Sequence, residues 1–171
     1  ATFSAIRGAQ TALVSGIRGT VDRMAGKAQL QVLLEGGVPE EVQEQIRDLP
    51  SIRAQSPVIE QIVVAGDAKL GSLLVLGVDL LGDREMRDYG FEGDADLDDP
   101  LLFLAQPDSV ALARPLAEKA GVKVGDPFVF QTPAGPKTVV VRGLLTPRGF
   151  AESFGGNLAV MDVYAAQTLF G

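Results

Sequence analysis

The stretch that decides the fold is residues 107–145, PDSVALARPLAEKAGVKVGDPFVFQTPAGPKTVVVRGLL. Its first part, residues 107–121, predicts a helix capped by Asp108 and ended by Gly121, where a left-handed residue is needed. Apolar contacts would come from Val110, Leu112, Ala113 and Leu116. Pro115 lies in the middle of this segment and predicts a kink or a helix in two pieces.

The second part of the stretch predicts a β-hairpin. Residues 128–131 (FVFQ) are aromatic and β-branched, and residues 137–145 are rich in valine. Between them, residues 132–136 (TPAGP) are turn formers. A helix that leads into a hairpin is typical of a small barrel or sheet module.

Composition excludes several functional classes. The 171 residues contain no cysteine and no histidine, so disulfides and the commonest neutral-pH base and metal ligand are missing. The net charge of −7 disfavours binding to nucleic acid. No apolar run has the length of a membrane-spanning helix, and the chain has no signal-peptide pattern.

Outward from the central stretch, the chain alternates between predicted helices and strands. Residues 1–27 predict an amphipathic helix, either lying on the core or, as we expect, projecting as a stalk. Strands are expected at residues 28–35, 51–65, 71–79 and 157–162, and a closing helix at 163–170. A helix that starts at Pro39 would bury Val42, Ile46 and Leu49. This order predicts an α/β lobe with a helix on one face of a sheet.

The acidic residues concentrate in residues 79–99, which hold nine acids and two bases. Asp94, Asp96 and Asp98 alternate as the first ligands of a calcium loop do. Asp99 and Ala105, however, stand where that loop needs glycine and glutamate. We interpret the segment as a short helix and a solvated acidic loop, and we expect no bound metal.

A glycine-rich loop at residues 148–156 carries the other candidate residues. Ser153 sits in a sequence close to a nucleophile elbow, but a Ser-His-Asp relay cannot form without histidine, and nothing places a lysine beside it for a Ser-Lys pair. We therefore assign no catalytic or cofactor-binding residue and expect no cofactor. Phe150 and Phe154 are the candidate partner contacts in this loop.

Several pieces of this sequence together resemble a known family. They are residues 25–28 (AGKA), 30–34 (LQVLL), 56–59 (SPVI), 76–79 (LGVD), 116–126 (LAEKAGVKVGD), 156–162 (GNLAVMD) and 166–170 (AQTLF). The order resembles the extracytoplasmic domain of MacB/LolC/FtsX-type ABC transporter permeases. The resemblance covers nearly the whole chain.

The resemblance implies an α+β fold in two lobes behind the stalk helix at 1–27. Residues 28–99 and 148–171 would form a porter-like α/β lobe with the acidic connection, and 100–147 a β-rich, sabre-like lobe. Because the family continues with further elements after this point, the first lobe would have an exposed sheet edge.

The resemblance also implies a function without catalysis. The domain would lie outside the cytoplasm in a cell-membrane permease, where it would bind a protein, peptide or lipoprotein. It would couple that binding to an ABC ATPase, in a transporter expected to be a dimer. Lipoprotein release, efflux and control of cell-wall hydrolases remain open as roles. A serine hydrolase that uses Ser153 and a free-standing ligand-binding module are the alternatives.

Overall fold

The computed structural model describes residues 30–34, 36–80, 96–97, 100–146 and 155–171. The predicted stalk helix at 1–27 and most of the acidic segment lie outside these residues. Phe150, Ser153 and Phe154 also lie outside them.

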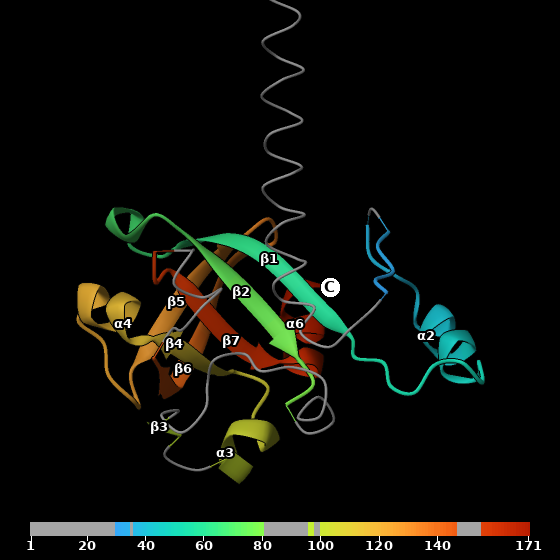
Figure 1. The fold of residues 1–171 in the computed structure, drawn as a ribbon. Coiled ribbons are helices and arrows are strands. Elements are labelled where there is room, and N and C mark those ends of the chain that lie inside the picture. Colours follow the sequence, from blue (N-terminus) through green and yellow to red (C-terminus); the bar gives the residue numbers. More distant parts are fainter. Residues whose placement is uncertain (1–29, 35, 81–95, 98–99, 147–154) are drawn as a thin grey trace, which may run out of the picture.

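A single seven-stranded sheet dominates the described residues (Figure 1). Its order is β3-β6-β4-β7-β2-β1-β5, and β5 also pairs with β6. The six strands from β6 to β5 therefore form a closed ring of pairings, and β3 pairs with β6 outside this ring. We call these six strands the closed sheet. The strands are β1 Val58–Ala65, β2 Ser72–Val78, β3 Asp96–Leu97, β4 Ser109–Ala113, β5 Pro127–Thr132, β6 Gly135–Leu145 and β7 Leu158–Asp162.

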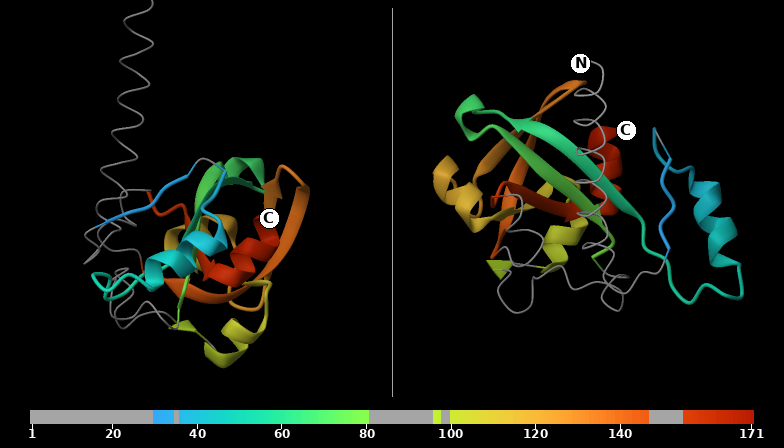
Figure 2. Two further views of the ribbon diagram at one scale, coloured as in Figure 1. Left: turned by 90° about the vertical axis from the view of Figure 1, so that its right-hand side faces the viewer. Right: turned by 45° about the horizontal axis from the view of Figure 1, so that its top comes forward.

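The helices are short. They are α2 Glu40–Arg47, the 3-10 turn η1 Ala68–Leu70, α3 Pro100–Ala105, α4 Arg114–Ala120 and α6 Val163–Phe170. Figure 1 and the right view of Figure 2 show α2 apart from the sheet, whereas α6 lies against it. The fold is thus a mixed α/β fold with one sheet and few helices.

The first half of the deciding stretch is a strand followed by a helix, so the prediction of one helix from residue 107 is wrong there. All five residues of β4 are buried. Strands β6 and β7 pair along its two edges, and helices α3 and α4 contact it. A strand that is buried on both faces reads as a nearly continuous apolar run. The helix begins only at Arg114, which places Pro115 in its first turn, where a missing N–H costs nothing. Gly121 ends the helix in the left-handed conformation, as predicted.

The second half of that stretch is the predicted hairpin. β5 and β6 pair antiparallel from Pro127 with Val140 to Thr132 with Gly135. Along β6, residues 139, 141, 143 and 145 are buried and alternate with less buried ones, which is the two-residue period of a strand with one face to the core.

The predicted strands at 71–79 and 157–162 are confirmed as β2 and β7, which pair in parallel from Leu74 with Leu158 to Val78 with Asp162. The predicted extended run at 51–65 is a strand only from Val58, directly after Pro57. The closing helix is confirmed as α6, and the carboxylate of its cap Asp162 accepts a hydrogen bond from Tyr164 N at 3.0 Å.

Helix α6 packs on β2 and β1 through a close contact at Gly77. A Cβ atom at this glycine would lie 2.4 Å from Ala166 Cβ and 3.2 Å from Ile59 Cβ. The last residue of α6, Phe170, lies 6.5 Å from the buried ring of Phe130, measured between ring centroids. These contacts join the closing helix to the core of the closed sheet.

The expected division into two lobes is not confirmed by this sheet. Strand β4 from the predicted sabre-like range pairs with β7 from the porter-like range, and β5 pairs with β1 in the same way. Strands β1 and β5 pair only at Val64 with Gln131 and Ala65 with Phe130, and Gly66 N donates to Val129 O at 2.8 Å across this seam. The expected exposed sheet edge stays a prediction. The residue boundaries of the lobes stay a prediction.

Candidate functional site: an exposed apolar arm

The predicted site residues cannot be placed by the structure. Phe150 and Phe154 lie outside the described residues and stay predicted partner contacts, and Ser153 lies outside them as well. Of the three alternating aspartates, only Asp96 is described, as part of β3. Within the described part of the chain, no group of three or more acidic, histidine or cysteine side chains is placed to hold a metal ion.

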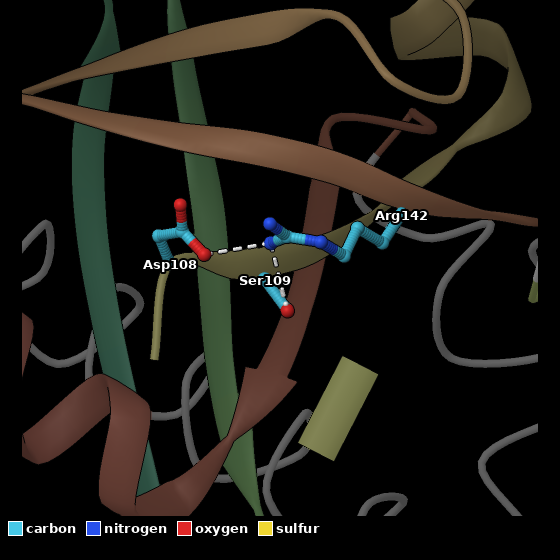
Figure 3. A network of polar contacts seen from close by, with 3 residues as sticks. All are labelled: Asp108, Ser109 and Arg142. Atoms are coloured by element: carbon cyan, nitrogen blue, oxygen red, sulfur yellow. Dashed lines mark hydrogen bonds and ion pairs between the residues drawn. The ribbon is translucent and has the colours of Figure 1, made fainter. Parts of the chain in front are cut away.

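One polar network lies on the closed sheet (Figure 3). Arg142 Nη1 donates to Asp108 Oδ1 at 2.7 Å and to Ser109 Oγ at 2.9 Å. Ser109 is buried, and Arg142 is largely so. Asp108 is therefore an ion-pair partner of β6 and not a helix cap, because the segment behind it is a strand.

This network has the chemistry of a structural clamp. An arginine stays protonated and can only donate, so it cannot serve as the base that would activate the Ser109 hydroxyl. The network instead joins the start of β4 to β6 and satisfies a buried hydroxyl, which would be costly to leave without a partner.

We expect Arg142→Met to lower the free energy of unfolding by about 2 kcal/mol, because it leaves the buried Ser109 hydroxyl and Asp108 without this donor. Urea unfolding followed by circular dichroism measures the change. Lys123→Met, at an exposed position, is the control and should change stability by less than about 0.5 kcal/mol. Equal effects of the two substitutions would show that the network does not stabilise the fold.

Among the described residues, most of the exposed large apolar side chains lie in residues 30–34 and 36–49, which we call the arm. None of its large apolar side chains is buried: Leu30, Val32, Leu33, Leu34, Val38, Val42, Ile46 and Leu49. Leu33, for example, has a relative exposure of 71%. Figures 1 and 2 show residues 30–34 alongside α2, with both apart from the sheet.

The local structure of the arm follows from its sequence. Gly36 and Gly37 both have positive φ angles and turn the chain, with Gly37 N donating to Leu34 O at 3.1 Å. Helix α2 begins after Pro39 with Glu40 and Glu41 in its first turn, where acids are favoured by the helix dipole.

Two expectations about the arm are wrong. Residues 30–34 form no strand, and α2 buries none of its residues. Both patterns indicated apolar elements, and a pattern alone predicts a covered face without saying what covers it. The sequence signal that could have identified the arm is its content of chain breakers: Gly36-Gly37 and Pro39 interrupt it, and Pro50 ends it before the first core strand.

Smaller exposed apolar groups occur elsewhere on the described surface. Ile62 and Val64 project from the same face of β1, and Leu101 and Leu102 are exposed on α3. Tyr164 is exposed on α6. Each of these groups has one or two members, and scattered exposed apolar residues of this kind are ordinary on protein surfaces.

No helix among the described residues combines the length and the apolar character needed to cross a membrane. No protein-family model matches the chain.

Comparison with known proteins finds similarity both in sequence and in structure. The chain is 32% identical over 118 residues to an uncharacterized ABC transporter permease protein of Mycobacterium tuberculosis, a match that covers 67% of this chain and 14% of that permease. This chain thus spans a small part of its relative's length. Among solved structures, it is similar to the extracellular domain of the noncanonic ABC-type transporter YknZ from Gram-positive bacteria. The TM-score is 0.53 at 13% identity, over 85% of this chain and 73% of the other.

These two findings agree with each other and with the resemblance noted in the sequence. The sequence match gives the kind of protein, and the structural match gives the fold. The chain is therefore a relative of ABC transporter permeases and has the fold of an extracellular domain of such a transporter.

Proposed function

We propose that this chain is the extracytoplasmic part of a membrane-embedded ABC transporter permease. In this role it binds a protein, peptide or lipoprotein outside the cytoplasm, and the full transporter couples that binding to hydrolysis by an ABC ATPase. Lipoprotein release, efflux and control of cell-wall hydrolases are the processes that such a domain would serve.

The observation that carries this proposal is the combination of a well-buried closed sheet with an apolar arm that lies outside it. The core of the closed sheet contains Phe130, Leu112 and Met161, all fully buried, so the fold does not need the arm for its core. The large apolar side chains of the arm are exposed, except for Val42 and Ile46, which are half-buried. Large exposed apolar surfaces of this kind mark sites of association.

Catalysis is not part of the proposal. The described polar network is held by an arginine, and histidine is missing from the whole sequence. Ser153 offers the alternative of a hydrolase, and a serine-reactive probe that adds its mass at Ser153 would support that alternative instead.

The absence of cysteine from the sequence provides a direct test of the location. In the full-length permease, with cysteines elsewhere replaced, Tyr164→Cys places a thiol at a position with 70% relative exposure. We expect a membrane-impermeant maleimide to label this thiol in intact cells, because the domain would face outward.

The matched control is Ala159→Cys, at a fully buried position of β7. It should react only after the protein is denatured. Labelling of Tyr164→Cys that requires permeabilised cells would place the domain on the cytoplasmic side and contradict the proposed function.

A further inference from the structure

The apolar residues of α2 form a stripe along one side of the arm. Val42 and Ile46 are four residues apart within α2 and therefore lie on one face of the helix. Val38 and Leu49 lie in the chain just before and just after the helix. Val42 and Ile46 are partly exposed, while Val38 and Leu49 are exposed. Anchors at such intervals are those of a helix that packs against another helix or in a groove.

The polar side chains of the arm are strongly acidic. Residues 30–34 and 36–49 contain four acids (Glu40, Glu41, Glu44 and Asp48) and one base, Arg47, so the net charge of the arm is one minus four, or −3. Arg47 Nε lies 3.9 Å from Asp48 Oδ1 in an exposed pair. The three glutamates of α2 have no basic neighbour within the helix except Arg47 near its end.

The acidic charge of the arm favours some partners over others. The candidates are a membrane, a second copy of this chain and another protein. Helices that lie on membranes carry lysine and arginine on the polar face because lipid headgroups are often anionic. In a symmetric contact between two copies of this chain, two acidic arms would face each other, and like charges that face each other are unfavourable. A protein surface with basic groups beside an apolar stripe is complementary in both respects.

We propose that the arm is a docking site for an amphipathic helix of an extracytoplasmic protein, with lysine or arginine on both sides of its apolar stripe. The partner's apolar stripe packs on Val42 and Ile46. Its basic side chains lie near Glu40, Glu41 and Glu44. This inference rests on the proposed function only in placing the partner outside the cytoplasm. The apolar and acidic character of the arm does not depend on that placement.

The test uses the 171-residue chain and two synthetic helical peptides of about 20 residues, long enough to form helix in water. Both peptides have the same leucine stripe. One has lysine at the flanking positions and the other has glutamate. Fluorescence anisotropy of the labelled peptide measures its dissociation constant. We expect the lysine peptide to bind and the glutamate peptide to bind at least about tenfold more weakly, a difference of about 1.4 kcal/mol.

Substitutions in the arm then locate the binding surface. The double variant Val42→Ser with Ile46→Ser should weaken binding of the lysine peptide at least about tenfold. The triple variant Glu40→Gln, Glu41→Gln and Glu44→Gln should weaken it and reduce its dependence on salt. None of these residues is buried, so the fold should be unchanged by circular dichroism.

Matched controls come from outside the arm. Leu101→Ser changes a leucine with 79% relative exposure on α3, and Glu118→Gln changes an exposed acid on α4. Neither should alter the dissociation constant. If the lysine peptide does not bind, or binds equally to the arm variants and the parent chain, the proposal is overturned.

Two further measurements test whether a second copy of the chain or a membrane binds the arm instead. Dimerisation in sedimentation experiments that disappears in the Val42→Ser, Ile46→Ser variant would assign the arm to a second copy and overturn the proposal. Binding to phosphatidylglycerol-containing vesicles that the same variant abolishes would assign it to a membrane. The cysteine-labelling experiment is unaffected by any of these results, so failure of the docking proposal is distinguishable from failure of the proposed function.

Discussion

Gly77→Ala is expected to lower the free energy of unfolding by about 3 kcal/mol, the upper end of the usual cost of overpacking a core. The new methyl carbon would lie 2.4 Å from Ala166 Cβ and 3.5 Å from Val163 Cα, so that α6 would have to move away from β2. Urea unfolding of the parent chain and the variant measures the difference, with circular dichroism as the probe.

A compensating substitution tests the physical reason for this loss. Ala166→Gly removes the methyl group that the new side chain would strike, so Gly77→Ala with Ala166→Gly should be more stable than Gly77→Ala alone. Ala166→Gly by itself is the control, with an expected loss of about 1 kcal/mol from glycine in a helix. If the two losses simply add, the contact between Gly77 and Ala166 does not limit the packing of α6.

Phe130→Ala should lower the free energy of unfolding by about 3–5 kcal/mol, as expected for an aromatic side chain removed from a packed core. Phe130 is fully buried, and its ring contacts Phe128 at 5.6 Å and Phe170 at 6.5 Å between centroids. The substitution therefore removes a contact within β5 and the one that holds the end of α6.

Tyr164→Ala is the matched aromatic control, because this side chain projects from α6 into solvent. It should change stability by less than about 0.5 kcal/mol. A loss below about 1 kcal/mol for Phe130→Ala would contradict the assignment of Phe130 to the core.

The sequence predicted local elements well where apolar residues and turn residues agree. The hairpin of β5 and β6, strands β2 and β7, and the start and end of α6 all follow from such agreement. Gly121 was predictable for the same reason, since its left-handed conformation closes a helix that ends in a basic turn.

The errors arise where a residue's role depends on distant strands. Residues 109–113 have helical spacing as well as a continuous apolar run, and only their position between β6 and β7 makes them a strand. The closing contact of the sheet joins β1 to β5, which are more than 60 residues apart at Ala65 and Phe130. Pairing over such separations is not encoded in local periodicity.

The candidate site was harder to predict than the fold. The apolar pattern of the arm predicts a strand and a buried helical stripe, whereas residues 30–34 form no strand and α2 has no buried residue. An amphipathic pattern indicates that one face of an element is apolar and is stabilised when something packs against it. Whether the cover is the chain's own core or another molecule depends on how many other elements already fill that core.

The parallel pairing of β2 with β7 places the beginning of the first strand of the closed sheet close to the end of its last strand. Val58, the first residue of β1, is opposite Val78, and Val78 is opposite Asp162, the last residue of β7. At one strand spacing each, these two points are about 10 Å apart at the same end of the sheet. A domain with this geometry can be inserted into a loop of another domain without separating the two ends of that loop. The chain continues from Asp162 directly into α6, so a pull from that side must first detach α6 from β2 and β1. Once it acts on Val58 and Asp162, the pull would peel the strands from that end, loading the hydrogen bonds one after another, and would not slide the strands lengthwise. The domain is therefore suited to being carried as an appendage and poorly suited to bearing tension in series with its host.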